Sequence, residues 1–133
     1  MKLKDEIKEV LKEHKEILVA YLYGSTVKGY DRKSSDIDVG LLLKEEFDAE
    51  PLCSARIAGE IKEKLGLHHE VDVRILNEGP YRFLHQVIRW GAIILSTDER
   101  QRVRFETSVI GRYIDFKPFY KQYDEKRRER LLA

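Results

Sequence analysis

Two aspartates stand where a β-strand is expected to be apolar. Asp36 and Asp38 interrupt an otherwise hydrophobic run over residues 36–43, although Asp is disfavoured in strands and a buried, unpaired carboxylate costs several kcal/mol. Side chains two positions apart lie on the same face of a strand, so both carboxylates point to one side of the sheet. Asp72 repeats the pattern between two valines. If the two strands pair, the sequence predicts three carboxylates on one side of the sheet.

Carboxylates this close repel one another unless a cation neutralises them. Oxygen ligands without a cluster of Cys or His favour magnesium or manganese over zinc. Phosphoryl and nucleotidyl transfer use such sites, because two metal ions can clamp the attacking and leaving oxygens while a further carboxylate accepts a proton. The residue types therefore predict a two-magnesium transfer site at Asp36, Asp38 and Asp72, in which manganese is an alternative.

A phosphate-binding element is expected nearby. Gly24 and Ser25 follow the preceding apolar run; glycine allows close approach of the backbone, and Ser25 can donate from its N–H and its hydroxyl to a phosphate oxygen. Lys28 and Arg32 could add positive charge for a triphosphate, and a solvated loop is the competing interpretation for both.

Hydrophobic periodicity predicts the elements that position these residues. Helices are expected over residues 3–11, 52–65, 81–88 and 103–114, with a last one from Pro118, and strands over residues 17–23, 36–43, 71–75 and 92–95. This order predicts a mixed α/β (α+β) fold with a small mixed sheet of about four strands and helices packed mainly on one face. We expect a single domain over residues 1–133, with a catalytic core at about 3–76 and a C-terminal helical part at about 80–133.

Composition narrows the classes of protein. The 133 residues are 42% hydrophobic and 37% charged with a net charge of +1, so no global basic field favours nucleic acid, and direct nucleic-acid binding is not expected. The only cysteine, Cys53, excludes a disulfide framework within the chain and fits a reducing, cytoplasmic setting. No apolar stretch approaches the roughly 20 residues of a membrane helix, and the charged start does not resemble a signal peptide.

The combination of Gly24-Ser25, ten intervening residues, Asp36-x-Asp38 and a later hydrophobic-Asp72-hydrophobic resembles the nucleotidyltransferase signature of the DNA polymerase beta superfamily. The stretch over residues 34–43 is similar to its minimal, single-domain members, the MNT proteins, which are often the antitoxins of HEPN/MNT toxin–antitoxin pairs. The resemblance covers about residues 3–76 and extends more loosely to residues 90–98 and 112–116.

This resemblance implies a role for each motif residue. Gly24 and Ser25 would hold the phosphates of ATP, Asp36 and Asp38 would bind two magnesium ions, and Asp72 would be the third carboxylate. The reaction would move AMP from ATP to an acceptor hydroxyl and release pyrophosphate. In HEPN/MNT pairs the acceptor is a tyrosine of the partner toxin, an RNase that the modification silences, so the resemblance implies a HEPN toxin as partner.

Other functions remain open from the residues alone. The nucleotide could pass to a small molecule or to RNA, although relatives with those acceptors usually carry a further domain. A non-catalytic module that masks a toxin is a second class. The tail over residues 117–133 has six basic and three acidic side chains; it is either a packed aromatic face with a solvated basic end or a docking surface for a protein or RNA.

Overall fold

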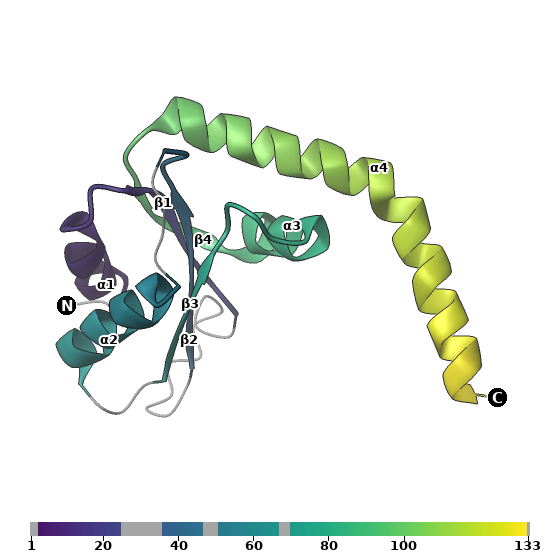
Figure 1. Ribbon diagram of the computed structural model, residues 1–133, viewed down its shortest axis with the longest axis horizontal. Helices are drawn as coiled ribbons and strands as arrows, with labels where there is room; N and C mark the ends of the chain where they lie inside the picture. Colours follow the sequence, from purple (N-terminus) through teal and green to yellow (C-terminus); the bar gives the residue numbers. More distant parts are fainter. Residues whose placement is uncertain (1–2, 25–35, 47–50, 67–69, 133) are drawn as a thin grey trace.

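A four-stranded mixed sheet organises the chain (Figure 1). In the computed structural model, which describes residues 3–24, 36–46, 51–66 and 70–132, the strands are β1 (Ile17–Tyr23), β2 (Ile37–Leu43), β3 (Val71–Ile75) and β4 (Ala92–Ser96). Their order is β3-β2-β1-β4; β1 is antiparallel to β2 and β4, whereas β2 and β3 run parallel. The four predicted strands are confirmed with ends that differ by no more than one residue.

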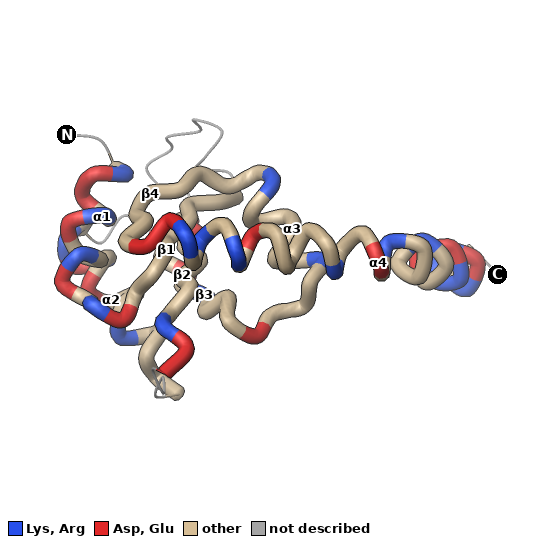
Figure 2. The backbone as a smooth tube through the Cα atoms, turned by 90° about the horizontal axis from the view of Figure 1, so that it is seen from above, with Lys and Arg blue, Asp and Glu red and all other residues tan. Residues whose placement is uncertain are grey.

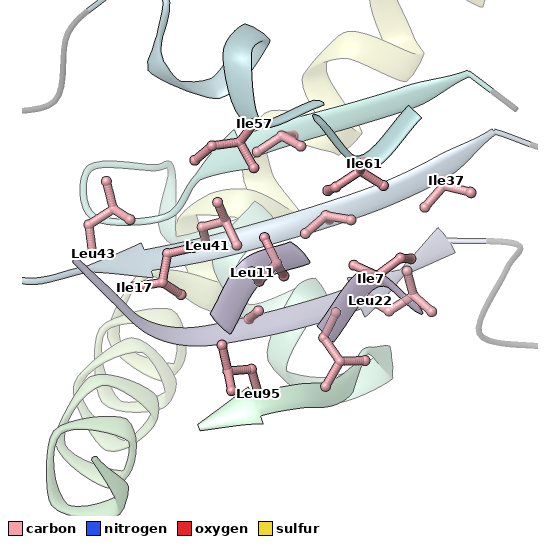
Figure 3. Close-up of a cluster of buried hydrophobic side chains, with 14 of the residues drawn as sticks. Ile7, Leu11, Ile17, Leu22, Ile37, Leu41, Leu43, Ile57, Ile61 and Leu95 are labelled. Carbon is pink, nitrogen blue, oxygen red and sulfur yellow. The ribbon is translucent and has the colours of Figure 1, made fainter. Parts of the chain in front are cut away.

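Helices α1 (Leu3–Lys12) and α2 (Cys53–Leu65) cover one face of the sheet (Figure 1). This layer is aliphatic, as Figure 3 shows, and the buried side chains labelled there are Ile7, Leu11, Ile17, Leu22, Ile37, Leu41, Leu43, Ile57, Ile61 and Leu95. Cys53 is buried at the start of α2. The α2 helix connects β2 to β3 and so allows these two strands to run parallel, because a parallel pair needs a crossover connection. The crossover brings the aspartates of β2 and β3 next to each other.

Helices α3 (Tyr81–Trp90) and α4 (Glu99–Leu132) lie on the opposite face (Figure 1). The buried residues of this second cluster are Val19, Tyr21, Leu42, Leu76, Leu84, Val87 and Val109. The mixed α/β class is confirmed, but the helices do not gather mainly on one face as predicted. The reason lies in β1, whose continuous apolar run leaves hydrophobic side chains on both faces, so each face needs a cover.

The C-terminal helix corrects a second prediction. Residues 99–132 form one helix with Pro118 inside it, instead of one helix over 103–114 and another from Pro118. Helix α4 bends partway along (Figure 1), and proline causes such bends because it lacks the N–H of the helical hydrogen bond and its ring crowds the preceding turn. The first half packs on the sheet through Val109, and the second half extends away from it.

None of the helices that the structure describes combines the length and the apolar character needed to cross a membrane.

Candidate active site

Two of the three predicted carboxylates are direct neighbours at one end of the sheet. Asp38 of β2 is the register partner of Asp72 on β3 and of Tyr23 on β1. Because directly paired residues share a face of the sheet, these three side chains lie on the side covered by α3 and α4. Asp36 immediately precedes β2 and is exposed. The predicted pairing of the two acidic strands is confirmed.

Gly24 leaves the space that the carboxylate of Asp38 occupies. Its φ of +78° lies in the left-handed region, and a Cβ atom at this position would stand 2.5 Å from Asp38 Oδ2. Both observations require glycine, the first because a side chain disfavours this backbone conformation and the second because the carboxylate occupies the space. Gly24, which the sequence analysis assigned to phosphate binding, is therefore also needed to accommodate the side chain of Asp38.

Negative charge is concentrated around Asp38. Burial raises the pKa of Asp38 above its ordinary value, and the carboxylates of Asp72 and Asp36 raise it further, while Arg74 acts in the opposite direction. The charged form of Asp38 is thus held at a free-energy cost, which a bound cation would remove. This is the electrostatic pattern of a site prepared for a positive ligand.

Arg74 is a neighbour that the sequence analysis missed. Its Nε donates a hydrogen bond of 3.1 Å to Asp72 Oδ2, and its guanidinium lies over the ring of Phe83, 5.4 Å from the ring centroid. Both charged side chains are exposed, so the pair is screened by water. The available signal was the spacing, since Arg74 stands two residues after Asp72 and therefore on the same face of β3.

Tyr23 was also missed. Its hydroxyl is buried without a hydrogen-bond partner among the described residues, and its ring meets Phe83 edge to face at 5.7 Å between centroids. Burial and the neighbouring Asp38 raise the pKa of Tyr23 to about 12, so the hydroxyl keeps its proton at neutral pH. Tyr23 thus places a neutral donor beside the carboxylates, directly before Gly24 in the sequence.

A divalent cation fits the donors at this end of the sheet. No three His, Cys, Asp or Glu side chains in the part of the chain that the structure describes lie close enough together to hold a metal ion by themselves. Magnesium, however, is usually held by one or two carboxylates together with substrate phosphates and water. Asp36 and Asp38 supply two carboxylates, and the repulsion that raises the pKa of Asp38 is what such an ion would relieve.

Three predicted residues, Ser25, Lys28 and Arg32, lie outside the described residues. A cavity of about 460 Å³ lies elsewhere, at the opposite end of β2, where Leu43, Lys44 and Arg104 line it. Asp36, Asp38 and Asp72 do not line that cavity.

The comparisons with known proteins agree with this geometry. The model of the polymerase beta nucleotidyltransferase family matches residues 5–100, which is most of the chain and includes all three aspartates. The chain belongs to the polymerase beta nucleotidyltransferase family. A comparison with curated protein sequences gives no significant match.

Solved structures with the same fold come from toxin–antitoxin complexes. One is a toxin–antitoxin structure with AMP-PNP, with a TM-score of 0.78 and 19% identity over 98% of both chains. Another is a tri-AMPylated HEPN toxin of Shewanella oneidensis in complex with its MNT antitoxin, with a TM-score of 0.74 and 17% identity over 98% of this chain and 97% of the other. A third is the MntA–HepT complex, with a TM-score of 0.73 and 17% identity over the same shares. At these identities the likeness establishes the fold.

Proposed function

We propose that this nucleotidyltransferase moves AMP from ATP to a tyrosine hydroxyl of a partner HEPN toxin and thereby acts as the antitoxin of that toxin. The observation that carries the proposal is the Asp38 carboxylate, which lies against Gly24 and whose pKa is raised by burial and then by Asp72 and Asp36. Such an arrangement gives the folded chain no stability, and it suits a site that binds a divalent cation together with a nucleotide.

Each residue of the site has a separate role in the proposed reaction. Asp36 and Asp38 would hold magnesium, and the metal would supply charge stabilisation for the transferring phosphoryl group. Gly24, with Ser25, would leave room for the phosphates of ATP next to Asp38. Asp72 would accept the proton of the attacking hydroxyl.

The reaction is a single displacement in this proposal. The acceptor oxygen forms a bond to the α-phosphorus of ATP, the bond from that phosphorus to the oxygen bridging to the β-phosphorus breaks, and pyrophosphate leaves with the electron pair. The hydroxyl proton goes to the carboxylate of Asp72, which is exposed and can pass it to solvent. Arg74, paired with Asp72 in the structure, would have to yield this carboxylate when the acceptor arrives.

Support for a toxin partner comes from the solved structures of similar fold. The AMPylated HEPN toxin with its MNT antitoxin and the structure with AMP-PNP support both a protein acceptor and ATP as the donor. The chain has a single cysteine, Cys53, which is buried. A chain that needs no disulfide of its own suits the reducing cytoplasm that we propose as its location.

The test is transfer from α-labelled ATP to the purified HEPN toxin of the same genome, with magnesium. We expect label on the toxin with the wild-type chain and none with the double variant Asp36→Asn/Asp38→Asn at equal folded concentration. Leu52→Ala is the matched control, because Leu52 is exposed and away from the carboxylates, and it should transfer as the wild type does. Label in added RNA or small molecules, but not in the toxin, would show that the acceptor is not the toxin. If the double variant neutralises the toxin as well as the wild type does, the chain acts by masking the toxin and not by modifying it.

A further inference from the structure

A groove lies on the inner side of the bend in α4. Its volume is about 730 Å³, and its walls come from α3 and from α4 on both sides of Pro118. We call residues 118–132 of α4 the arm. Six charged side chains line the groove: Arg82, Lys117, Lys121, Arg128, Asp124 and Glu125. The groove is separate from the carboxylates of the active site and has no role in the proposed reaction.

Two contacts connect the walls of the groove. Arg82 of α3 donates two hydrogen bonds to Asp124 of the arm, at 3.2 and 2.6 Å, in the fork geometry that gives arginine–carboxylate pairs their directionality. At the root of the arm, the ring of Tyr113 stacks on His85 with 3.8 Å between centroids. These contacts connect the arm and its root to α3, while the arm itself extends away from the sheet (Figure 1).

The groove carries an excess of positive charge. Four of its six charged residues are basic and two are acidic, and the pairing of Arg82 with Asp124 leaves Lys117, Lys121 and Arg128 against Glu125. Figure 2 shows both acidic and basic residues on the arm. Ile114 and Pro118 add apolar surface to the same lining. The occupant that these walls fit is an amphipathic segment with acidic side chains.

We propose that this groove binds an acidic, partly apolar segment of the toxin partner and holds the toxin beside the active site. The inference rests on the proposed function for the identity of the partner. Successive residues of α3 connect the two places: Arg82 lines the groove, and Phe83 contacts the ring of Tyr23 and lies under Arg74. A segment held in the groove thus raises the local concentration of acceptor at the carboxylates.

The extent of the similarity to the complexes supports this occupant. The match to the toxin–antitoxin structure with AMP-PNP covers 98% of the chain and so includes most of the arm, which the family model over residues 5–100 does not reach. The arm is therefore shared with chains solved in complex with a toxin, although the match of the family itself ends before it.

Two other occupants fit less well. RNA binding uses free aromatic faces for base stacking, but Tyr113 is already stacked on His85 and Tyr120 lies under Arg82. A two-fold dimer through this surface would place the same basic walls against each other. Both occupants are outcomes of the test below.

The experiment compares two double charge reversals on the arm. Lys121→Glu/Arg128→Glu alters the groove lining, whereas Lys126→Glu/Arg130→Glu makes the same change of charge on exposed residues outside it. The probe is the purified HEPN toxin of the same genome, inactivated as an RNase, with affinity measured by titration calorimetry in about 0.1 M salt. We expect the groove variant to weaken the affinity at least tenfold and the control variant less than threefold.

Each outcome decides one point. Equal losses for the two variants, or no loss for the groove variant, would overturn the groove as docking site. A single-stranded RNA bound by the wild type and lost only in the groove variant would replace the toxin by RNA, and a wild-type dimer in sedimentation that only this variant dissolves would replace it by a second copy. Equal helix content by circular dichroism establishes that both variants are folded.

Measuring AMP transfer with the same variants distinguishes a failure of the docking groove from a failure of the proposed reaction. If the groove variant raises the KM for toxin and leaves kcat unchanged, docking and chemistry both stand. Unchanged transfer by both variants refutes the groove alone. Groove-dependent binding of toxin without transfer by the wild type refutes the chemistry alone.

Discussion

The two faces of the sheet use the same four strands in different ways. Under α1 and α2 the buried side chains are aliphatic apart from Cys53 (Figure 3). Under α3 and α4 the sheet presents the hydroxyls of Tyr21 and Tyr23 and, at one end, the carboxylates of Asp38 and Asp72. One face is thus built for packing, and the other mixes packing with polar contacts.

The difference indicates how the fold tolerates an unfavourable charge. Asp38 has a raised pKa, so its ionised form costs free energy in the folded chain, and the aliphatic face supplies the stability that offsets it. Tyr21, by contrast, is satisfied, because its hydroxyl donates 2.7 Å to Glu106, which also accepts from Arg102. At the acidic end, by contrast, the hydroxyl of Tyr23 has no hydrogen-bond partner among the described residues, and the pKa of Asp38 is raised.

The largest expected effect on stability comes from neighbouring leucines of β2. Leu41 is fully buried under α1 and α2, and Leu42 is 7% exposed on the other face. Leu41→Ala should lower the free energy of unfolding by about 3–5 kcal/mol and Leu42→Ala by about 2–3 kcal/mol, through lost transfer energy and the cavity left behind. Urea unfolding measures both, and an equal or reversed order would contradict the division between the faces.

Gly24→Ala should act on catalysis. The new Cβ would meet Asp38 Oδ2 at 2.5 Å in a left-handed backbone, so we expect transfer of AMP to fall about a hundredfold through displacement of the carboxylate. Gly59→Ala in α2 is the control, because nothing lies within 4 Å of its Cβ; it should leave transfer unchanged and stabilise the helix by about 0.5–1 kcal/mol. Wild-type transfer by the Gly24 variant would refute the role of this glycine as a seat for Asp38.

A smaller effect is expected for the paired tyrosine. Tyr21→Phe removes the hydrogen bond to Glu106 and should cost about 1 kcal/mol of unfolding free energy, since Glu106 keeps its bond from Arg102. A double-mutant cycle with Glu106→Gln measures the coupling by thermal unfolding. Additive losses would show that the contact does not hold α4 to the sheet.

The smallest effect concerns pH. Hydrogen bonds from Arg102 and Ser96 lower the pKa of Glu99 from 4.5 to about 2. A lowered carboxyl pKa stabilises the fold above the unfolded value and loses this contribution as pH falls, here from about 4.5 towards 2. The difference in urea midpoint between wild type and Glu99→Gln should therefore shrink across this window, and it should be reduced further by salt because Glu99 is exposed. A difference that is constant from pH 6 to pH 3 would contradict the pairing.

Local pattern was enough to predict the strands and the acidic pairing. The apolar run before Gly24 and the spacing of Asp36 and Asp38 depend on the period of a strand, which a single segment contains. The contact of Asp72 with Arg74 was within reach by the same spacing. These features needed no knowledge of how distant elements pack.

What the sequence did not reveal depends on contacts between distant segments. The ring of Tyr23, whose hydroxyl is buried, packs against Phe83, 60 residues further along the chain. The continuity of α4 through Pro118 was also missed, because proline ends a helix by its local propensity while the contacts of the arm with α3, such as Arg82 with Asp124, favour its continuation.

The central claim is that the acidic end of the sheet serves transfer at the expense of stability, and Asp38→Asn tests it most directly. Thermal unfolding without metal and AMP transfer with magnesium are measured on the same preparations of wild type and variant. Because the variant removes a carboxylate whose ionisation is opposed by burial, Asp72 and Asp36, we predict a higher Tm together with loss of transfer. A lower Tm with transfer retained would contradict the account and make Asp38 a structural residue.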